Sequence, residues 1–112
     1  MKNRAADALL KCGIPSNIKG FSYIVHAMEL LDNCLGKCKT CVLYEKIAKD
    51  FGTTAVRVER AMRHAFGFVY TKLPIKEVEK YFDLANQKNG AQLACFYYRL
   101  CRERDLEGTN GN

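Results

Sequence analysis

The amino-acid sequence predicts an all-α fold, a single six-helix domain that contains a helix-turn-helix. Its 112 residues suffice for one hydrophobic core. Apolar residues recur with helical spacing between short turn signals, and no segment shows the sustained alternation of an exposed strand. Both prolines, Pro15 and Pro74, stand where a helix can begin. With 48% hydrophobic residues and no apolar run near the roughly 20 residues of a membrane span, the chain is predicted to be folded and soluble.

Turn signals divide the chain into the six expected helices. Gly13 ends the first, the cysteine-rich stretch 33–40 separates the second from the third, and Gly52 ends the third. The expected helices cover about residues 3–12, 20–32, 42–51, 54–71, 74–85 and 90–104. The Gly/Asn-rich end of the chain is predicted to fray, which gives a domain over residues 1–106 and a flexible tail over 107–112.

The apolar residues of these helices gather on one face each. In the first two helices this face is predicted to comprise Ala6, Leu9, Leu10, Phe21, Ile24, Val25, Met28 and Leu31. In the last two helices, Tyr81, Tyr97 and Tyr98 stand at helical spacing beside other large apolar residues. Three tyrosines can form a stacking platform for single-stranded nucleic acid. Their spacing instead favours the core and a surface for a partner helix.

The charge distribution points to a polyanionic partner. Lysine and arginine exceed the acidic residues by 18 to 12, a net charge of +6. The excess is +3 in residues 1–40, +3 in 41–72 and zero in 73–112. A basic excess attracts nucleic acid. The first 13 residues carry four charged side chains and lack the apolar segment of a secretory signal. We therefore expect a cytoplasmic protein whose six cysteines are thiols.

Residues 42–67 have the pattern of a helix-turn-helix. Ala48 is a small residue that lets two helices cross closely. Gly52, four residues later, tolerates the positive φ that ends the first helix. Val58 fills the gap between the helices, and a threonine at position 53 or 54 can cap the second helix.

The second helix of this pair, about residues 54–70, is predicted to be two-sided. One face gathers Ala55, Val58, Met62, Ala65, Phe66 and Val69, and the other gathers Thr53, Val56, Arg57, Arg60, Arg63, His64 and Gly67. Arginine pairs with guanine O6 and N7 together, and Glu59 at the edge of the basic face can accept from a cytosine amino group. Considered by itself, the basic charge of this face is also explained by solvated side chains on an ordinary surface helix. The turn pattern favours a helix that enters the major groove of double-stranded DNA.

Two segments resemble one known family. Gly13-Ile-Pro-Ser-Asn-Ile-Lys-Gly-Phe21 is similar to a motif near the start of that family's domain, and Val42-Leu-Tyr-Glu-Lys-Ile-Ala-Lys-Asp-Phe-Gly-Thr-Thr-Ala-Val-Arg-Val-Glu-Arg-Ala-Met-Arg-His-Ala65 is similar to its helix-turn-helix. The family is the C-terminal DNA-binding effector domain of the stage-zero sporulation protein A, a sporulation response regulator. The resemblance covers roughly residues 5–104.

The resemblance implies a six-helix transcription factor that reads a short promoter box. It implies tandem copies, and so a homodimer, on repeated boxes and a contact with the RNA polymerase sigma subunit. It assigns base contacts to Arg57, Glu59 and Arg60, and phosphate contacts to Lys19, Thr53, Thr54, Arg63 and His64.

Two departures from the family pattern affect this interpretation. Met1 lies about a dozen residues before the first motif, so we expect no receiver domain and expect binding that is constitutive or controlled by expression. The loop between the second and third helices is about two residues shorter and richer in cysteine. An alternative function follows from the first departure: a receiver-less interaction module that dimerises with, or antagonises, a full-length regulator through its last two helices.

Cys34, Cys38 and Cys41 form a C-x3-C-x2-C cluster. Structural zinc needs four nitrogen or sulfur ligands, with Cys12 or His26 as candidates for the fourth, and iron–sulfur ligation is an alternative. The spacing gives one triplet rather than two close pairs, which favours cysteine as a small buried hydrophobe. We predict no metal.

No enzymatic site is visible in the sequence. It shows no nucleophile motif, phosphate-binding loop or catalytic pair of carboxylates. His26 stands among apolar residues, as a satisfied or surface histidine does, and Cys95 and Cys101 are expected to be core or inert surface residues. We predict a protein that is not an enzyme and needs no cofactor.

Overall fold

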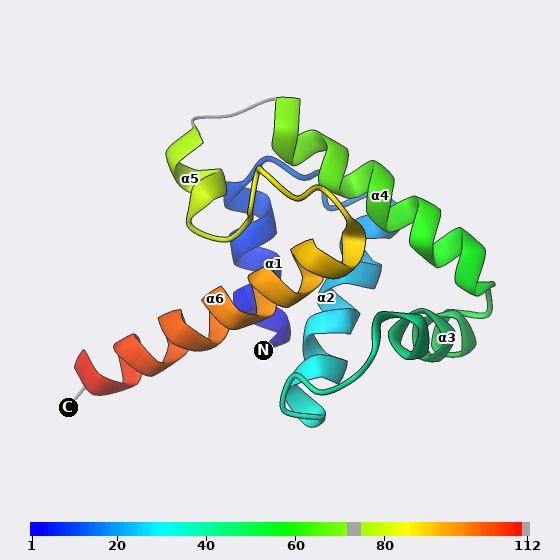
Figure 1. Cartoon of the computed structure of the whole chain (residues 1–112), viewed down its shortest axis with the longest axis horizontal. Coiled ribbons are helices and arrows are strands. Elements are labelled where there is room, and N and C mark those ends of the chain that lie inside the picture. Colours follow the sequence, from blue (N-terminus) through cyan, green and yellow to red (C-terminus); the bar gives the residue numbers. More distant parts are fainter. Residues whose placement is uncertain (72–74, 111–112) are drawn as a thin grey trace.

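The computed structural model describes residues 1–71 and 75–110. Over these residues the fold is all-helical and contains no strand, which confirms the predicted fold class. The six helices are α1 (Lys2–Lys11), α2 (Lys19–Asn33), α3 (Thr40–Phe51), α4 (Ala55–Thr71), α5 (Ile75–Glu79) and α6 (Asn89–Asn110) (Figure 1).

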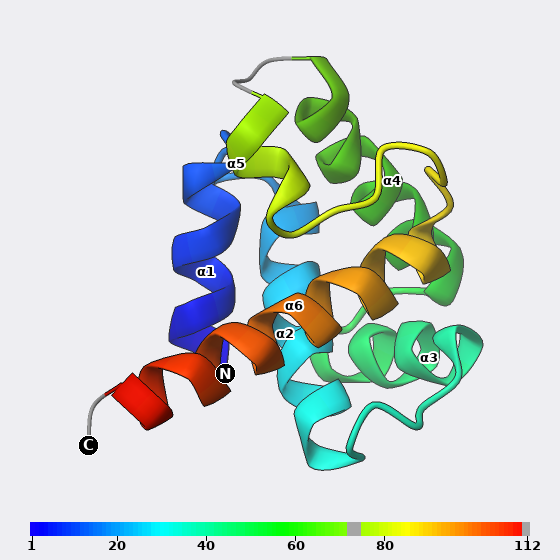
Figure 2. The ribbon, with the colours of Figure 1, turned by 60° about the vertical axis from the view of Figure 1, so that its left-hand side comes forward.

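Helix α2 is the centre of the fold. It packs against α1, α3, α4 and α6, and its residues Ile24, Ala27 and Met28 are completely buried. Figure 2 shows α6 crossing α2, with α1 on one side of α2 and α3 on the other. Close to α3, His26 Nε2 lies 2.8 Å from Asp50 Oδ2. His26 is therefore a satisfied histidine that ties α2 to α3.

The inward face of α1 differs from the prediction. Leu9 is buried as expected, but Leu10 is 53% exposed and Ala6 is only half-buried. The buried face instead contains Ala5 and Ala8. Positions 5, 8 and 9 follow the i, i+3, i+4 spacing of one helical stripe, and position 10 falls outside it.

Helix α5 ends earlier than predicted. The sequence predicts a helix over residues 74–85, but α5 stops at Glu79, and the predicted start at 74 lies outside the described residues. Beyond the helix, the buried Gln92 holds the backbone of Asp83: Gln92 Oε1 accepts from the Asp83 amide (3.1 Å), and Gln92 Nε2 donates to the Asp83 carbonyl (2.6 Å). A backbone whose amide and carbonyl both bind a side chain does not continue a helical ladder.

Helix α6 ends later than predicted, at Asn110 instead of about residue 104. Its additional turns are tied to α1, because Arg4 forms ion pairs with Glu103 (2.9 Å) and Glu107 (2.6 Å). The three tyrosines assigned to the last helices take different positions. Tyr81 is buried and donates to Glu103, Tyr97 is half-buried, and Tyr98 is 61% exposed.

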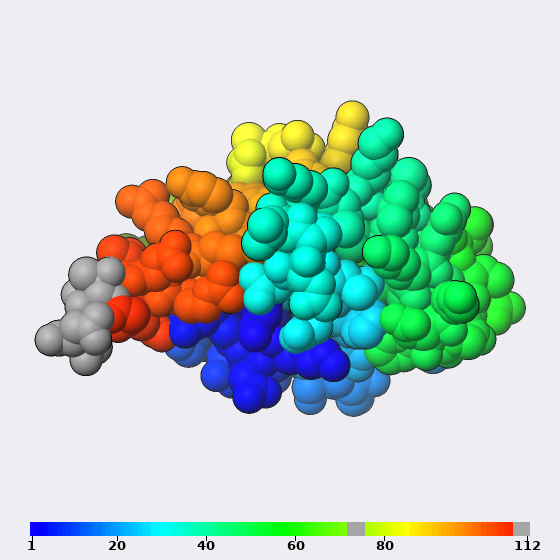
Figure 3. Space-filling view, turned by 90° about the horizontal axis from the view of Figure 1, so that it is seen from below, coloured from blue at the N-terminus to red at the C-terminus, as the bar shows by residue number. Residues whose placement is uncertain are grey.

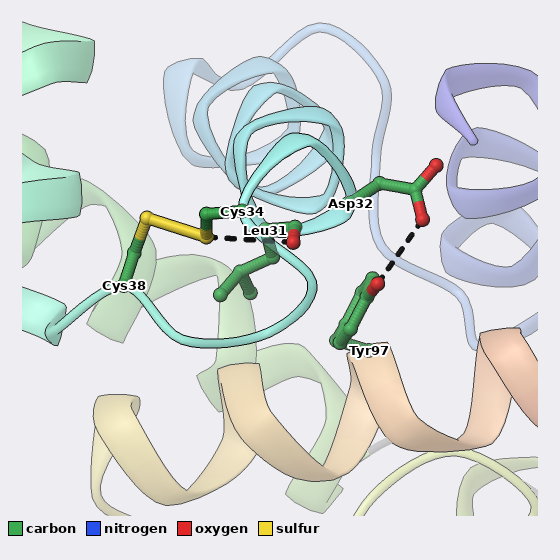
Figure 4. The surroundings of a disulfide bond; sticks show 5 residues. All are labelled: Leu31, Asp32, Cys34, Cys38 and Tyr97. Carbon is green, nitrogen blue, oxygen red and sulfur yellow. Dashed lines mark hydrogen bonds between the residues drawn. A yellow bond between two sulfur atoms is a disulfide. The ribbon is translucent and has the colours of Figure 1, made fainter.

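The prediction that all cysteines are thiols is wrong for one pair. Cys34 and Cys38 form a disulfide across the loop that follows α2 (Figure 4). The chain reverses there through residues with positive φ, Leu35 and Gly36, and the Gly36 amide donates to the Leu31 carbonyl (2.8 Å). This reversal brings the two Cα atoms to 6.2 Å, within the range that a disulfide spans.

Candidate nucleic-acid interface

Helices α3 and α4 form the predicted helix-turn-helix. Gly52 has φ 65°, the left-handed conformation, and the Thr53 amide donates to the Ala48 carbonyl (2.9 Å). Thr54 is the cap of α4, because its Oγ1 accepts from the Arg57 amide (3.3 Å). Ala48 and Val58 are both buried, as the sequence predicts.

Helix α4 has an apolar and a basic face, and burial confirms this division. Val58, Met62, Ala65, Phe66 and Val69 are buried, although Ala55 is only half-buried. The exposed residues of the opposite face are Val56, Arg57, Arg60, Arg63 and His64. Three arginines and a histidine therefore share one accessible surface, which has the residue types and the dimensions of a helix that enters the DNA major groove.

One edge of this face is held by contacts within the protein. Glu59 forms an ion pair with Arg63 one turn away. The backbone carbonyl of Glu59 accepts a hydrogen bond from Asn89 Nδ2 (2.9 Å), which attaches the start of α6 to α4. On the opposite side of the basic face, the His64 and Phe68 rings pack in a T-shaped arrangement with a centroid distance of 5.3 Å. Asn89 was not predicted from the sequence, because no local pattern signals a contact between residues 30 positions apart.

The other edge lies against the start of α2. Gly20 is buried there, and a Cβ added to it would meet the Ala61 carbonyl and lie 2.7 Å from Ala65 Cβ. This crossing places Lys19, which is exposed, beside α4. The structure thus brings the start of α2, where Lys19 stands, against α4, and places Thr53 and Thr54 at the start of α4.

A comparison with protein families identifies the family of this chain. The family described as "Sporulation initiation factor Spo0A C terminal" matches residues 5–97, which include every part of the interface described above. The chain belongs to the Spo0A C-terminal family. Members of this family are DNA-binding effector domains of a sporulation regulator, not enzymes. This Spo0A-type domain therefore binds double-stranded DNA and acts in transcription regulation.

The cysteines lie outside the interface of the Spo0A-type domain. Among residues 1–71 and 75–110, no three His, Cys, Asp or Glu side chains are grouped so that they could hold a metal ion. Cys34 and Cys38 are bonded to each other, and Cys41 is exposed. Cys12, the candidate fourth ligand, is buried, and burial raises the pKa of its thiol to about 11. Among the residues that the structure describes, no helix is both long enough and apolar enough to cross a bilayer.

Proposed function

We propose that this protein is a sequence-specific transcription factor that places α4 in the major groove of a short promoter box. The observation that carries the proposal is the exposed basic face of α4 on a capped helix-turn-helix. Arg57 and Arg60 are exposed on this face, whereas Arg63 is held in an ion pair with Glu59, so Arg57 and Arg60 are available to base edges. We assign base contacts to Arg57, Glu59 and Arg60.

The phosphate contacts in this proposal lie around the base-reading residues. Lys19 stands at the start of α2, and Thr53 and Thr54 lie at the start of α4. Arg63 and His64 lie about two turns further along α4. Cations and helix starts are the usual partners of DNA phosphates, which position a protein on the duplex without reading sequence. We extend the proposal to tandem copies, and so a homodimer, on repeated boxes and to a contact with the RNA polymerase sigma subunit in the cytoplasm, which the family resemblance implies.

Selection from a random duplex pool tests this function directly. We expect the full chain to enrich a short box, and a titration at physiological salt to show about 10³-fold or greater preference for that box over a scrambled duplex. Equal affinity for both duplexes would contradict sequence-specific binding. It would favour instead the interaction module, whose test is direct binding to a full-length regulator.

A further inference from the structure

A groove lined mainly by polar residues runs along the edge of α4, where it shares Glu59 and Arg63 with the residues assigned to DNA so far. It has a volume of about 620 Å³ and lies between α3, α4 and the segment that precedes α6. Its lining includes Tyr44, Glu59, Arg63 and the residues 85–90. Within that segment Lys88 is exposed, and the sequence pattern predicts no role for it. Figures 1 and 2 both show the segment beside α4.

The position of this segment relative to α4 is held by buried side chains. Asn89 Nδ2 donates to the Glu59 carbonyl (2.9 Å), and the Gln92 amide donates to the Lys88 carbonyl (3.0 Å) in the first turn of α6. Gln92 is completely buried and also holds both backbone groups of Asp83. Lys88 is therefore attached to α4 through ordered backbone on both sides.

The two edges of α4 are nearly opposite one another. The Lys19 edge contacts Ala61 through Gly20, and the Lys88 edge contacts Glu59 through Asn89. At 100° per residue, positions 59 and 61 project about 160° apart around the helix axis. The exposed arginines lie on the wider arc of about 200° between these two edges, and the buried apolar residues lie on the narrower one. The basic face is thus flanked by one lysine on each side.

We propose that Lys88 binds a DNA backbone phosphate, on the strand opposite to the one that Lys19 contacts. This inference rests on the proposed function, in which α4 lies in the major groove. That groove is about 12 Å wide and the helix with its side chains spans about 10–12 Å, so the two backbones stand beside the two edges of the helix. Arg63 lines the same protein groove as Lys88 and adds positive charge there, while its ion-pair partner Glu59 offsets part of that charge. The 22-residue α6 directs its positive end to the same place.

The test compares Lys88→Ala with a charge-matched control, Arg102→Ala. Arg102 is exposed in the C-terminal half of α6. Figure 3 shows this part of α6, in orange to red, at the opposite end of the molecule from the green segments of α3 and α4. The affinity of each variant for the selected box is measured as a function of salt concentration. We expect Lys88→Ala to reduce the slope of log K against log salt by about 0.9, the value for one phosphate. The ratio of wild-type affinity to Lys88→Ala affinity then rises about 3.5-fold for each fourfold dilution of salt. We expect Arg102→Ala to follow the wild type.

Replacing single DNA phosphates by neutral methylphosphonates identifies the strand that each lysine contacts. Each phosphate around the box is replaced in turn, and we expect one position at which wild type and Lys88→Ala bind equally, on the strand opposite to the equivalent position for Lys19→Ala. Both positions on one strand, or a Lys88→Ala slope equal to that of Arg102→Ala, would overturn the inference while the wild type still prefers its box. A wild type that binds no duplex would overturn the proposed function as well.

Discussion

Gly20 lies directly on the backbone of Ala61, so that a Cβ at position 20 would be 2.9 Å from the Ala61 carbonyl carbon and 2.7 Å from Ala65 Cβ. A clash with backbone in the interior of a helix is not relieved by a side-chain rotation. We therefore expect Gly20→Ala to lower the free energy of unfolding by about 1–3 kcal/mol, measured by denaturant titration. Because the same crossing positions Lys19, DNA affinity is expected to fall too.

Gly67 provides the matched control for this prediction. It lies within α4, where an added Cβ meets nothing within 4 Å. Alanine has a higher helix propensity than glycine, so Gly67→Ala is expected to raise the free energy of unfolding by up to about 1 kcal/mol. Equal effects of the two substitutions would contradict close packing at Gly20.

Gln92 is completely buried and organises the segment between α5 and α6. Its Nε2 donates to the Asp83 carbonyl (2.6 Å) and to the Tyr70 hydroxyl (2.7 Å), and its Oε1 accepts from the Asp83 amide. Gln92→Met keeps the length of the side chain but removes all three bonds. We expect a loss of about 1–3 kcal/mol in the free energy of unfolding, because buried polar groups lose their partners.

Tyr70→Phe separates the contributions to this network. It removes only the hydroxyl that accepts from Gln92, and leaves both bonds to the Asp83 backbone. We expect a cost of about 0.5–1.5 kcal/mol, smaller than that of Gln92→Met. Faster amide hydrogen exchange over residues 80–88 in the Gln92 variant alone would show that the segment has been released; unchanged exchange would contradict the role of Gln92.

Asp32 joins α2 to α6 and gives stability a pH dependence. It accepts from Arg104 (3.1 Å) and from the Tyr97 hydroxyl (3.0 Å), as Figure 4 shows for the tyrosine. The Arg104 hydrogen bond lowers the pKa of Asp32 below its ordinary value of 3.8. The stabilisation is therefore fully present above pH 3.8 and is lost as the pH falls through the lower folded-state pKa.

Asp32→Asn tests this dependence. We expect the variant to lose less than about 1 kcal/mol at pH 7, because the ion pair is partly exposed, and to differ less from wild type at pH 3. Denaturant titrations at both pH values measure the difference. In an Arg104→Gln background the effect of Asp32→Asn at pH 7 should shrink. A difference that stays constant with pH would contradict the ion pair.

The Cys34–Cys38 disulfide predicts a defined thiol count. In denaturant without reductant, four of the six cysteines are expected to react with a thiol reagent, and all six after reduction. The double variant Cys34→Ser/Cys38→Ser should give four before and after reduction. Six reactive thiols in the unreduced protein would show that the pair is open.

The helix-turn-helix was predictable from sequence because its signals are local. The turn depends on three residues that are close together in the sequence, Ala48, Gly52 and Val58. The basic face of α4 follows from the 3.6-residue helical period alone. The end of α5 was not predictable, because it depends on Gln92, which binds the Asp83 backbone from the following helix. A pattern within one segment carries no information about a partner that tertiary packing supplies.

The edges of the interface show the same limit. The sequence indicates which side of α4 is exposed, but not that Gly20 and Asn89 attach two other segments to opposite edges of it. The disulfide is a related case. The sequence predicts that all six cysteines are thiols, whereas the reversal at Gly36 brings Cys34 close to Cys38.

Arg60 and Lys19 are predicted to contribute to DNA binding in different ways. Arg60 is exposed on the middle of the basic face of α4, where a bidentate contact to guanine is worth about 1–3 kcal/mol of discrimination. Lys19 stands at the edge, where a phosphate contact carries no sequence information.

Arg60→Ala should therefore lose affinity for the selected box and keep its affinity for scrambled DNA apart from the charge effect. Lys19→Ala should weaken both duplexes alike and reduce the salt slope by about 0.9. Titrations of both variants against both duplexes at two salt concentrations measure these quantities, and equal losses on every duplex for both variants would contradict the division between base and phosphate contacts.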